Sequence, residues 1–245
     1  MKGVILAGGF ATRLRPLTLV TNKHLLPIYS KPMIYYPLEA MAKAGVTELL
    51  LTCSPDHAGH FTNLLAAGEE FGLSLYYAVQ KNPKGGISQA IALAEKFAKD
   101  EPILVILGDN IFNFDLASAV KKFEETKKGA MIFGVRLDTK SRQYGVIEMD
   151  KESNVLSIEE KPENPKSDIA QIGVYMYDKK VFDYIRQLKP SARGELEVTD
   201  LNNFYLKEGT LTCNIIDWWI DAGTSYDELL RANNEVAKFV KEGKL

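Results

Sequence analysis

A regular alternation of short apolar runs with helical segments over residues 2–135 most constrains the fold. The runs are rich in Val, Ile and Leu and end in glycine or polar residues, as buried strands do. We expect strands at 4–6, 47–52, 73–79, 102–107 and 130–135 and helices at 38–44, 56–68, 87–99 and 116–127. This pattern is typical of right-handed βαβ units, whose parallel sheet is covered by helices on both faces.

The rhythm changes beyond residue 136, where short strands are separated by polar turns. We expect strands at 144–149, 155–159, 171–177 and 210–217 and helices at 181–188, 199–207 and 226–241. Neither a repeat nor a Pro/Ser-rich linker divides the chain. The sequence therefore predicts one α/β domain over 1–245, in which a small β-rich lobe is built onto the sheet of the first half.

Composition excludes several classes of protein. Lys and Arg number 30 against 32 Asp and Glu, which argues against a nucleic-acid polymer bound by bulk charge. Cys53 and Cys213 lie in apolar or β-rich segments and predict buried thiols, not a disulfide framework. With neither a signal peptide nor an apolar stretch long enough for a bilayer, we expect a cytoplasmic protein without membrane contact. The sequence leaves open whether it forms a homo-oligomer.

The first expected strand runs into a glycine turn that is followed by cations. Gly8 and Gly9 let backbone N–H groups approach a ligand closely, and Thr12, Arg13 and Arg15 bring a hydroxyl and two permanent charges. Such a turn can hold a polyphosphate. An ordinary strand-to-loop turn with surface arginines explains these residues equally well on local grounds.

Two carboxylates end apolar segments and could share a cation. Asp109 follows the apolar run 102–107, and Asp221 follows Trp218-Trp219-Ile220. Ligands collect beyond the carboxyl ends of parallel strands, and oxygen ligands of this kind suit Mg²⁺. Each aspartate alone fits a structural role such as helix capping, and Lys161 alone fits a surface ion pair. A Ser/His/Asp or Cys/His arrangement is not evident, which disfavours a covalent hydrolase.

An ordered set of motifs resembles the sugar-phosphate nucleotidyltransferase family, and in particular its glucose-1-phosphate thymidylyltransferase branch. The resemblance spans nearly the whole chain. It rests on Leu6-Ala-Gly-Gly-x-x-Thr-Arg-Leu-x-Pro16, Lys23-His-Leu-Leu-Pro27, Lys31-Pro-Met-Ile-Tyr-Tyr-Pro37, Gln80, Gly85-Gly86, Gly108-Asp109-Asn110, Tyr144-Gly145, Glu160-Lys161-Pro162, Gly173-Val-Tyr175, Gly194-Glu-Leu-Glu-Val-Thr-Asp200 and Trp219-Ile-Asp221.

This resemblance implies a fold and a reaction. The fold is a Rossmann-like mixed, mostly parallel sheet flanked by helices, with a nucleotide-binding half at 1–135 and a sugar-phosphate-binding half with a closing helix at 136–245. The reaction is Mg²⁺-dependent transfer of a nucleotidyl group from dTTP to glucose 1-phosphate, giving dTDP-glucose and pyrophosphate. The resemblance leaves open UTP or CTP as the donor and, as a lesser alternative, a non-catalytic sugar-nucleotide-binding regulator.

Site residues carry over by position. The resemblance implies that the nucleotide is bound by Leu6, Gly8, Gly9, Thr12, Arg13, Lys23, Gln80, Gly85, Gly86 and Asp109. It implies that the sugar phosphate is bound by Tyr144, Gly145, Glu160, Lys161 and Tyr175, that Asp109 and Asp221 hold Mg²⁺, and that the catalytic residues are Arg13, Lys23, Asp109, Lys161 and Asp221.

The chain departs from the family pattern at three places. Ala11 stands where the branch usually has glycine, and His24 stands where glutamine is common. The sequence also stops soon after residue 241, whereas longer members carry further C-terminal helices associated with an allosteric nucleotide site and subunit contacts. We therefore do not expect feedback inhibition by the sugar-nucleotide product through that site.

Overall fold

The structure is a computed structural model that describes residues 1–245 except Phe10, Pro83 and Leu245. The strands are β1 Lys2–Ala7, β2 Pro27–Ile28, β3 Lys31–Pro32, β4 Glu48–Cys53, β5 Ser74–Val79, β6 Ile103–Leu107, β7 Asn110–Phe112, β8 Ala130–Arg136, β9 Gly145–Met149, β10 Val155–Glu160, β11 Ile169–Tyr177, β12 Leu211–Ile216 and β13 Trp219–Asp221. The α-helices are α1 Tyr35–Lys43, α2 Ala58–Leu65, α3 Ile87–Ala92, α4 Glu95–Ala98, α5 Leu116–Thr126, α6 Val181–Gln187, α7 Val198–Lys207 and α8 Tyr226–Lys241. Short 3-10 helices occupy Thr12–Leu14, Leu17–Leu19, Lys23–Leu25, Pro55–His57 and Glu69–Phe71.

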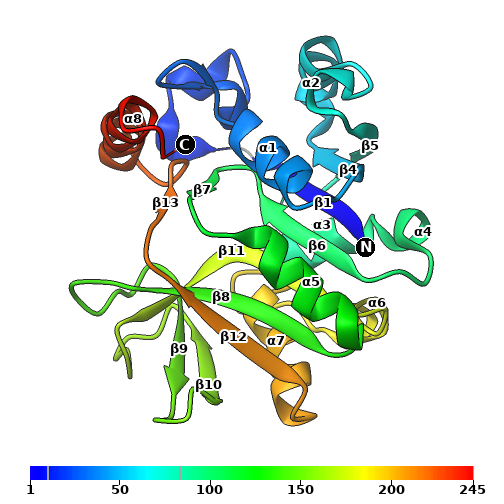
Figure 1. Ribbon diagram of the computed structural model, residues 1–245, viewed down its shortest axis with the longest axis vertical. Helices are drawn as coiled ribbons and strands as arrows, with labels where there is room; N and C mark the ends of the chain where they lie inside the picture. The colour runs from blue at the N-terminus through cyan, green and yellow to red at the C-terminus, as the bar shows by residue number, and fades with distance from the viewer. Residues whose placement is uncertain (10, 83, 245) are drawn as a thin grey trace.

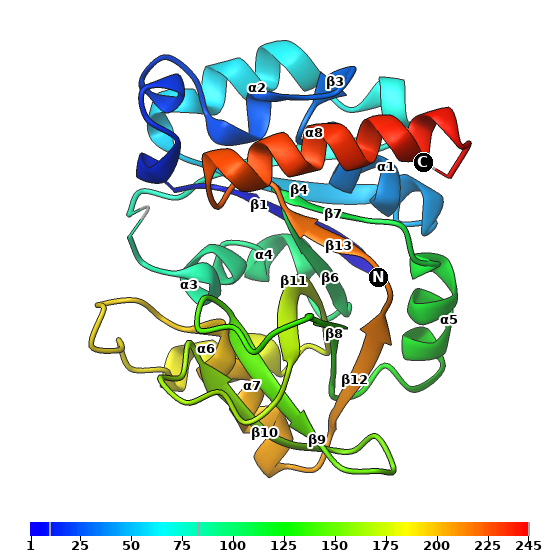
Figure 2. The same cartoon turned by 90° about the vertical axis from the view of Figure 1, so that its left-hand side faces the viewer.

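Among the described residues, nine strands form one sheet (Figures 1 and 2). Strands β6, β1, β4 and β5 are parallel neighbours, β11 runs antiparallel to β6, and β8 continues the sheet from β11 to β12. The predicted mixed sheet is confirmed. Because β8 to β12 come from both halves of the sequence, the two halves share one set of backbone hydrogen bonds.

Strand β11 divides at Gly173. Its first residues pair with β9 through Ile169 and Ala170, and its last residues pair with β6 from Val174 onward. The Gly173 N–H lies between these two pairings and donates to Oδ1 of Asn110 at 2.8 Å. Because β11 pairs first with β9 and then with β6, the Gly173 N–H is free to bond the side chain of Asn110, the neighbour of Asp109.

Helices cover both faces of the sheet, as expected for βαβ units. Helices α1, α2 and α5 bury Leu38, Phe61 and Phe123 against one face. Helices α3, α4, α6 and α7 bury side chains such as Ile91 and Tyr205 against the other. Helix α5 shows the local cause, since its apolar residues recur at helical spacing and the Asp115 side chain accepts from the Ser118 N–H at 3.2 Å.

The closing helix α8 packs on a separate apolar cluster. Ala232 and Val236 of α8 meet Ile111 of β7 and Ile220 of β13, and these two strands pair with each other. Figures 1 and 2 show α8 beside β13. The closing helix therefore covers the strand pair that carries Asp221.

Several predicted boundaries are wrong. The helix expected at 87–99 is interrupted at Leu93 and Ala94, whose N–H groups bond three residues back, so that α3 and α4 are separate. The helix expected at 56–68 is shorter, because Ala66 adopts a positive φ of 46° after α2. Helix α1 begins at Tyr35, earlier than expected, since Pro37 in its first turn needs no backbone donor.

Both cysteines are free thiols, as predicted. Cys53 is buried as expected, but the expectation of a buried Cys213 is wrong, because Cys213 on β12 is only half-buried. In the part of the chain that the structure describes, none of the helices has the length and hydropathy that crossing a bilayer requires.

Candidate active site

Two adjoining cavities open beyond the carboxyl ends of β1 and β6. The β1-side cavity, of about 300 Å³, is lined by Leu6, Gly8, Gly9, Lys23, Gln80, Gly86 and Asp109. The β11-side cavity, of about 180 Å³, is lined by Arg13, Tyr144, Gly145, Glu160, Lys161 and Tyr175. Ile87, Leu107, Glu195 and Asp221 line both cavities, which therefore form one divided cleft.

Most of the residues predicted for the site line this cleft. Two of them, Thr12 and Gly85, line neither cavity, and Arg13 lines the β11-side cavity and not the β1-side one. Within the loops expected to bind ligand at 8–15 and 80–86, Phe10 and Pro83 lie outside the described residues.

Two glycines are closely packed around the β1-side cavity. A Cβ on Gly8 would lie 2.4 Å from Oε1 of Gln80, which is buried. Gly86 has a φ of +89°, and a Cβ there would lie 2.7 Å from the backbone oxygen of Leu196. The loop after Arg193 thus packs directly on the glycine turn at 85–86.

A buried ion pair borders the β1-side cavity, near Asp221 of the shared wall. The Lys23 ammonium contacts Oδ2 of Asp109. Burial opposes ionisation of Asp109, but the Lys23 charge outweighs it and holds the pKa of this carboxyl well below its usual range. Burial likewise lowers the Lys23 pKa, yet Asp109 and Asp221 raise it further, so Lys23 is a cation throughout the neutral range.

Asp221 is the second carboxylate of this cluster. Strand β13 pairs with β7 so that Asp221 lies opposite Asn110, the neighbour of Asp109. Burial and the Asp109 charge raise the Asp221 pKa to about 7. A carboxyl that is removed from water beside a second negative charge undergoes such a rise.

The donor set fits a hard divalent cation. Asp109 and Asp221 offer oxygen ligands beside an ammonium that already neutralises one of them. The described residues contain no group of three or more His, Cys, Asp or Glu side chains around one point. Mg²⁺ is commonly held by one or two carboxylates plus phosphate oxygens and waters, so two carboxylates suffice.

The β11-side cavity carries a network around Glu160. Oε2 of Glu160 accepts from the Thr199 hydroxyl at 2.6 Å, and Oε1 lies 3.3 Å from the Arg193 guanidinium and 3.5 Å from Nζ of Lys161. Lys161 itself has a φ of 44°, a left-handed conformation that strains a side-chain-bearing residue. Two cations and one acceptor thus border the space next to Asp221.

Sequence reasoning missed several polar residues of this cleft, among them Asn110, Gln171, Arg193 and Glu195. Oδ1 of Asn110 accepts from the Gly173 N–H and, at 2.6 Å, from Nε1 of Trp219, while its Nδ2 donates to Oδ1 of Asp109 at 3.2 Å. Asn110 therefore orients the first carboxylate from the strand pair that holds the second. Two sequence features could have identified members of this group: Asn110 is adjacent to Asp109, and Arg193 precedes the motif that begins at Gly194.

Ala11 departs from the expected glycine in a conformation that glycine favours. Its φ is 45° and its ψ is 43°, in the left-handed region. Its carbonyl accepts from the Thr18 hydroxyl at 2.8 Å and from the Leu14 N–H at 3.1 Å, so the turn is held from two sides.

We expect Ala11→Gly to stabilise the protein by about 0.5 kcal/mol. Removing Cβ relieves roughly 1 kcal/mol of left-handed strain, and the more flexible unfolded chain offsets part of this gain. Urea unfolding measures the difference. Ala40→Gly, within helix α1, is the matched control and should destabilise by about 1 kcal/mol. Equal destabilisation by both changes would contradict the strain at Ala11.

His24 is buried beside the ion pair and is held neutral. Its Nδ1 donates to Oδ1 of Asn22 at 2.6 Å. Burial and the neighbouring Lys23 charge lower the His24 pKa to about 3, against 6.5 for a free side chain. Between these values the unfolded chain binds a proton that the folded protein does not, so stability rises with pH.

This histidine should make the protein less stable in mild acid. At pH 5 the depressed pKa removes about 2 kcal/mol from the unfolding free energy relative to pH 8. In His24→Gln the difference between pH 8 and pH 5 should shrink by that amount, as urea unfolding at the two pH values will show. His60→Gln, at an exposed position of α2, should leave the difference as in the unchanged protein. An unaltered pH dependence in His24→Gln would refute the assignment.

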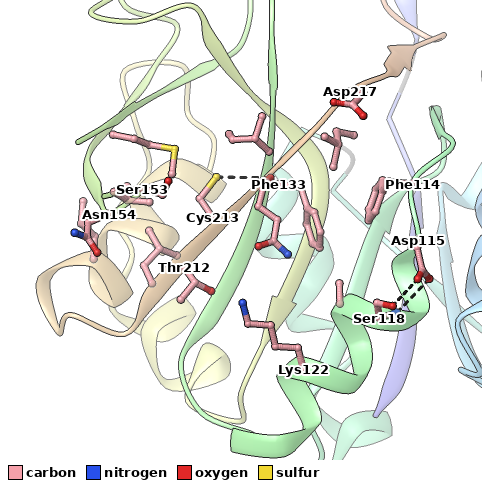
Figure 3. Close-up of a pocket in the computed structure, with 18 of the residues that line it drawn as sticks. Phe114, Asp115, Ser118, Lys122, Phe133, Ser153, Asn154, Thr212, Cys213 and Asp217 are labelled. Atoms are coloured by element: carbon pink, nitrogen blue, oxygen red, sulfur yellow. Dashed lines mark hydrogen bonds between the residues drawn. The ribbon is translucent and has the colours of Figure 1, made fainter. Parts of the chain in front are cut away.

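A larger groove lies elsewhere on the molecule. It has a volume of about 910 Å³ between α5 and β12, where Figure 3 shows Phe114, Lys122 and Thr212. Its lining contains none of the residues predicted for catalysis or binding. Size alone therefore does not identify the active site.

A protein-family model and several curated proteins match nearly the whole chain. Residues 2–238 match the family model described as nucleotidyl transferase. The chain is 44% identical over 245 residues to the glucose-1-phosphate thymidylyltransferase of Neisseria gonorrhoeae, covering 98% of this chain and 83% of that protein. It is 42% identical to the enzyme of the same name from Mycobacterium tuberculosis, covering 95% and 81%.

Solved structures give the same result. A Bacillus anthracis protein described as a glucose-1-phosphate thymidylyltransferase, crystallised with sucrose, is similar with a TM-score of 0.90 and 46% identity, covering 96% of this chain and 94% of that one. A UDP-glucose pyrophosphorylase with UDP-glucose bound has a TM-score of 0.85 at 24% identity, covering 97% and 98%, and so shares the fold. With the family model matching almost every residue and both cavities lined by its motifs, this chain belongs to the nucleotidyl transferase family.

Proposed function

We propose that this enzyme transfers a thymidylyl group from dTTP to glucose 1-phosphate, giving dTDP-glucose and pyrophosphate. The observation that carries the proposal is the pair of cavities that meet at Asp221, one beside a glycine turn and one beside Lys161 and Arg193. Two substrates can occupy such a cleft with their phosphates at the shared wall. The names of the relatives favour this nucleotide and this sugar over others.

The reaction needs no protein nucleophile. A phosphate oxygen of the sugar phosphate forms a bond to the α-phosphorus of dTTP, and the bond from that phosphorus to the pyrophosphate oxygen breaks. Catalysis then consists of positioning and charge neutralisation. Lys161 and Arg193 suit the attacking phosphate because both border the β11-side cavity, while Arg13 suits the charge that develops on pyrophosphate.

Asp109 and Asp221 would hold the Mg²⁺ that the family chemistry implies. When bound, it neutralises phosphate oxygens at the reacting centre. Lys23 already neutralises Asp109 and lies at the same wall, so its ammonium can turn to a phosphate when Asp109 has another cation. Asn110 keeps the Asp109 carboxylate oriented in either state.

We propose that residues of the first half of the chain recognise the base and that residues of the second half recognise the sugar. Gln80 is buried at the β1-side cavity, and its Nε2 lies 3.4 Å from Oε1 of Gln89, which leaves its oxygen toward Gly8. An amide so placed can bond the edge of a pyrimidine. Tyr144, Gly145, Glu160 and Tyr175 border the cavity assigned to the sugar.

A matrix of nucleoside triphosphates against sugar 1-phosphates tests the assignment. Pyrophosphate release should be fastest with dTTP and glucose 1-phosphate and should require added Mg²⁺. Faster release with UTP or CTP would make the enzyme a uridylyl- or cytidylyltransferase. Binding of sugar nucleotides without release from any pair would instead identify a regulator.

A further inference from the structure

The wall of the β11-side cavity formed by β11 contains a chain of polar side chains that the assigned roles do not use. Gln171 lines this cavity together with Tyr175, four residues further along the strand. Behind Gln171, and away from the cavity, lie Asn202 of α7 and Tyr177 of β11, both fully buried. Buried polar groups of this kind are retained only when each has a partner.

The hydroxyl of Tyr177 determines how the Asn202 amide is oriented. It donates to Oδ1 of Asn202 at 2.6 Å, and Asn202 is its one hydrogen-bond partner among the residues that the structure describes. If the amide were reversed, its NH₂ would face the phenol oxygen and the hydroxyl proton would have no acceptor. An unmatched buried donor costs about 1–3 kcal/mol, which disfavours the reversed amide.

The orientation of the Asn202 amide determines that of the Gln171 amide. With Oδ1 of Asn202 facing Tyr177, Nδ2 of Asn202 donates to Oε1 of Gln171 at 3.2 Å. The Gln171 oxygen is therefore engaged inside the protein, and the Gln171 NH₂ is left on the cavity side. Burial raises the Tyr175 pKa, and the Gln171 side chain lowers it, as an N–H near the phenol oxygen does. An amide NH₂ has two N–H donors, so the second remains for a ligand.

Glu160 lies across Gly145 from Gln171, on the same face of the sheet. Glu160 of β10 pairs with Gly145 of β9, and a Cβ on Gly145 would be 3.4 Å from Cβ of Gln171 and 3.5 Å from Oε2 of Glu160. A hydroxyl over Gly145 can thus donate to the Glu160 side chain while it accepts from Gln171. An alcohol satisfies both partners at once, and a C–H group at the same place satisfies neither.

We propose that Gln171 is a specificity-determining residue for the sugar, donating from Nε2 to one hydroxyl of the bound sugar 1-phosphate with an orientation fixed by Tyr177 and Asn202. The proposal rests on the proposed function only in taking a sugar 1-phosphate as the occupant of the β11-side cavity. It assigns Tyr177 and Asn202 as positioning residues that never touch the substrate.

The experiment compares Gln171→Met, which keeps the side-chain length without polar groups, with the unchanged enzyme. The substrates are glucose 1-phosphate and analogues that each lack one hydroxyl. The unchanged enzyme should lose about fivefold to tenfold in kcat/KM when the hydroxyl read by Gln171 is missing. Gln171→Met should lose part of this factor with glucose 1-phosphate, mainly in KM. It should then discriminate less at that hydroxyl, where only the contact with Glu160 remains, and as strongly as before at the others. Its KM for dTTP should not change.

Retention of the full discrimination at every hydroxyl by Gln171→Met would overturn the proposal. Gln171→Glu is a second variant, which keeps the contact with Asn202 but presents an acceptor to the sugar, and it should lose the same discrimination. Titration calorimetry with the sugar-nucleotide product and with dTDP gives a readout besides turnover, since only binding of the sugar nucleotide should weaken.

Variants of two buried tyrosines distinguish a loss of amide orientation from a general loss of stability. Tyr177→Phe frees the Asn202 amide to reverse and should reduce discrimination at the same hydroxyl. Tyr205→Phe is the matched control, because this neighbouring ring also loses a buried hydrogen bond, to Oδ1 of Asp178 at 2.9 Å, without contact with Asn202. Equal effects of both changes on discrimination would refute the orienting role. If the nucleotide matrix selects another sugar 1-phosphate, the proposed function fails, and analogues of that sugar test Gln171 independently.

Discussion

Asp109→Asn is expected to reduce pyrophosphate release by on the order of 10³-fold while the protein stays folded. The change removes one of the two carboxylates that suit Mg²⁺ and leaves the Lys23 ammonium without its charged partner. The fold should persist, because the Asp109 carbonyl still accepts from the Ala222 N–H at 3.0 Å and asparagine has nearly the same shape.

Two measurements accompany this variant. Turnover with dTTP and glucose 1-phosphate gives the size of the loss, and electron paramagnetic resonance of added Mn²⁺ should show weaker binding. Asp217→Asn is the matched control, since Asp217 is an exposed carboxylate after β12 and away from the cleft. Turnover near that of the unchanged enzyme in Asp109→Asn would remove the metal role from this residue.

Arg13→Ala is expected to lower kcat by on the order of 10²–10³-fold and to change the KM of either substrate much less. Arg13 lines the β11-side cavity, and its charge lowers the Lys23 pKa, so it lies near the Lys23–Asp109 ion pair of the β1-side cavity. Negative charge increases on the departing pyrophosphate in the transition state, so a cation there acts on the chemical step more than on binding.

Arg15→Ala is the natural comparison for this change. Arg15 is exposed, two residues along the same loop, and lines neither cavity. Its loss should have little effect on kcat. Steady-state kinetics decide the matter, because a pure KM effect in Arg13→Ala, or equal effects in both variants, would show that Arg13 contributes only general attraction for anions.

Much of the fold could be predicted from the sequence, because its signals are local. Apolar runs such as Ile103–Leu107 are followed by helices with apolar residues at helical spacing, and each pattern identifies its own element. The position of Asp109 beyond β6 follows from the rule for parallel strands. Its meeting with Asp221 depends on β7 and β13, which have three residues each and are too short to show a pattern.

Other features of the cleft depend on contacts that no local pattern reports. The family resemblance identified Tyr175 and Glu160. The orientation of the Gln171 amide, in contrast, depends on Asn202 in a helix and on Tyr177 in the same strand. Arg193 can likewise be recognised as a site residue only from its ion pairs with Glu160 and Glu197. Roles that depend on three elements at once need the tertiary structure.

The strands β1, β6 and β11 lie side by side, and the two cavities open at this edge of the sheet. Neighbouring strands keep a spacing of about 4.8 Å that backbone hydrogen bonds set and side chains hardly alter. The sheet therefore fixes the distance between the two cavities, which we propose hold the nucleotide and the sugar phosphate. Changes that loosen the packing beneath β6 should accordingly slow turnover by misaligning the reactants, while each substrate alone binds as before.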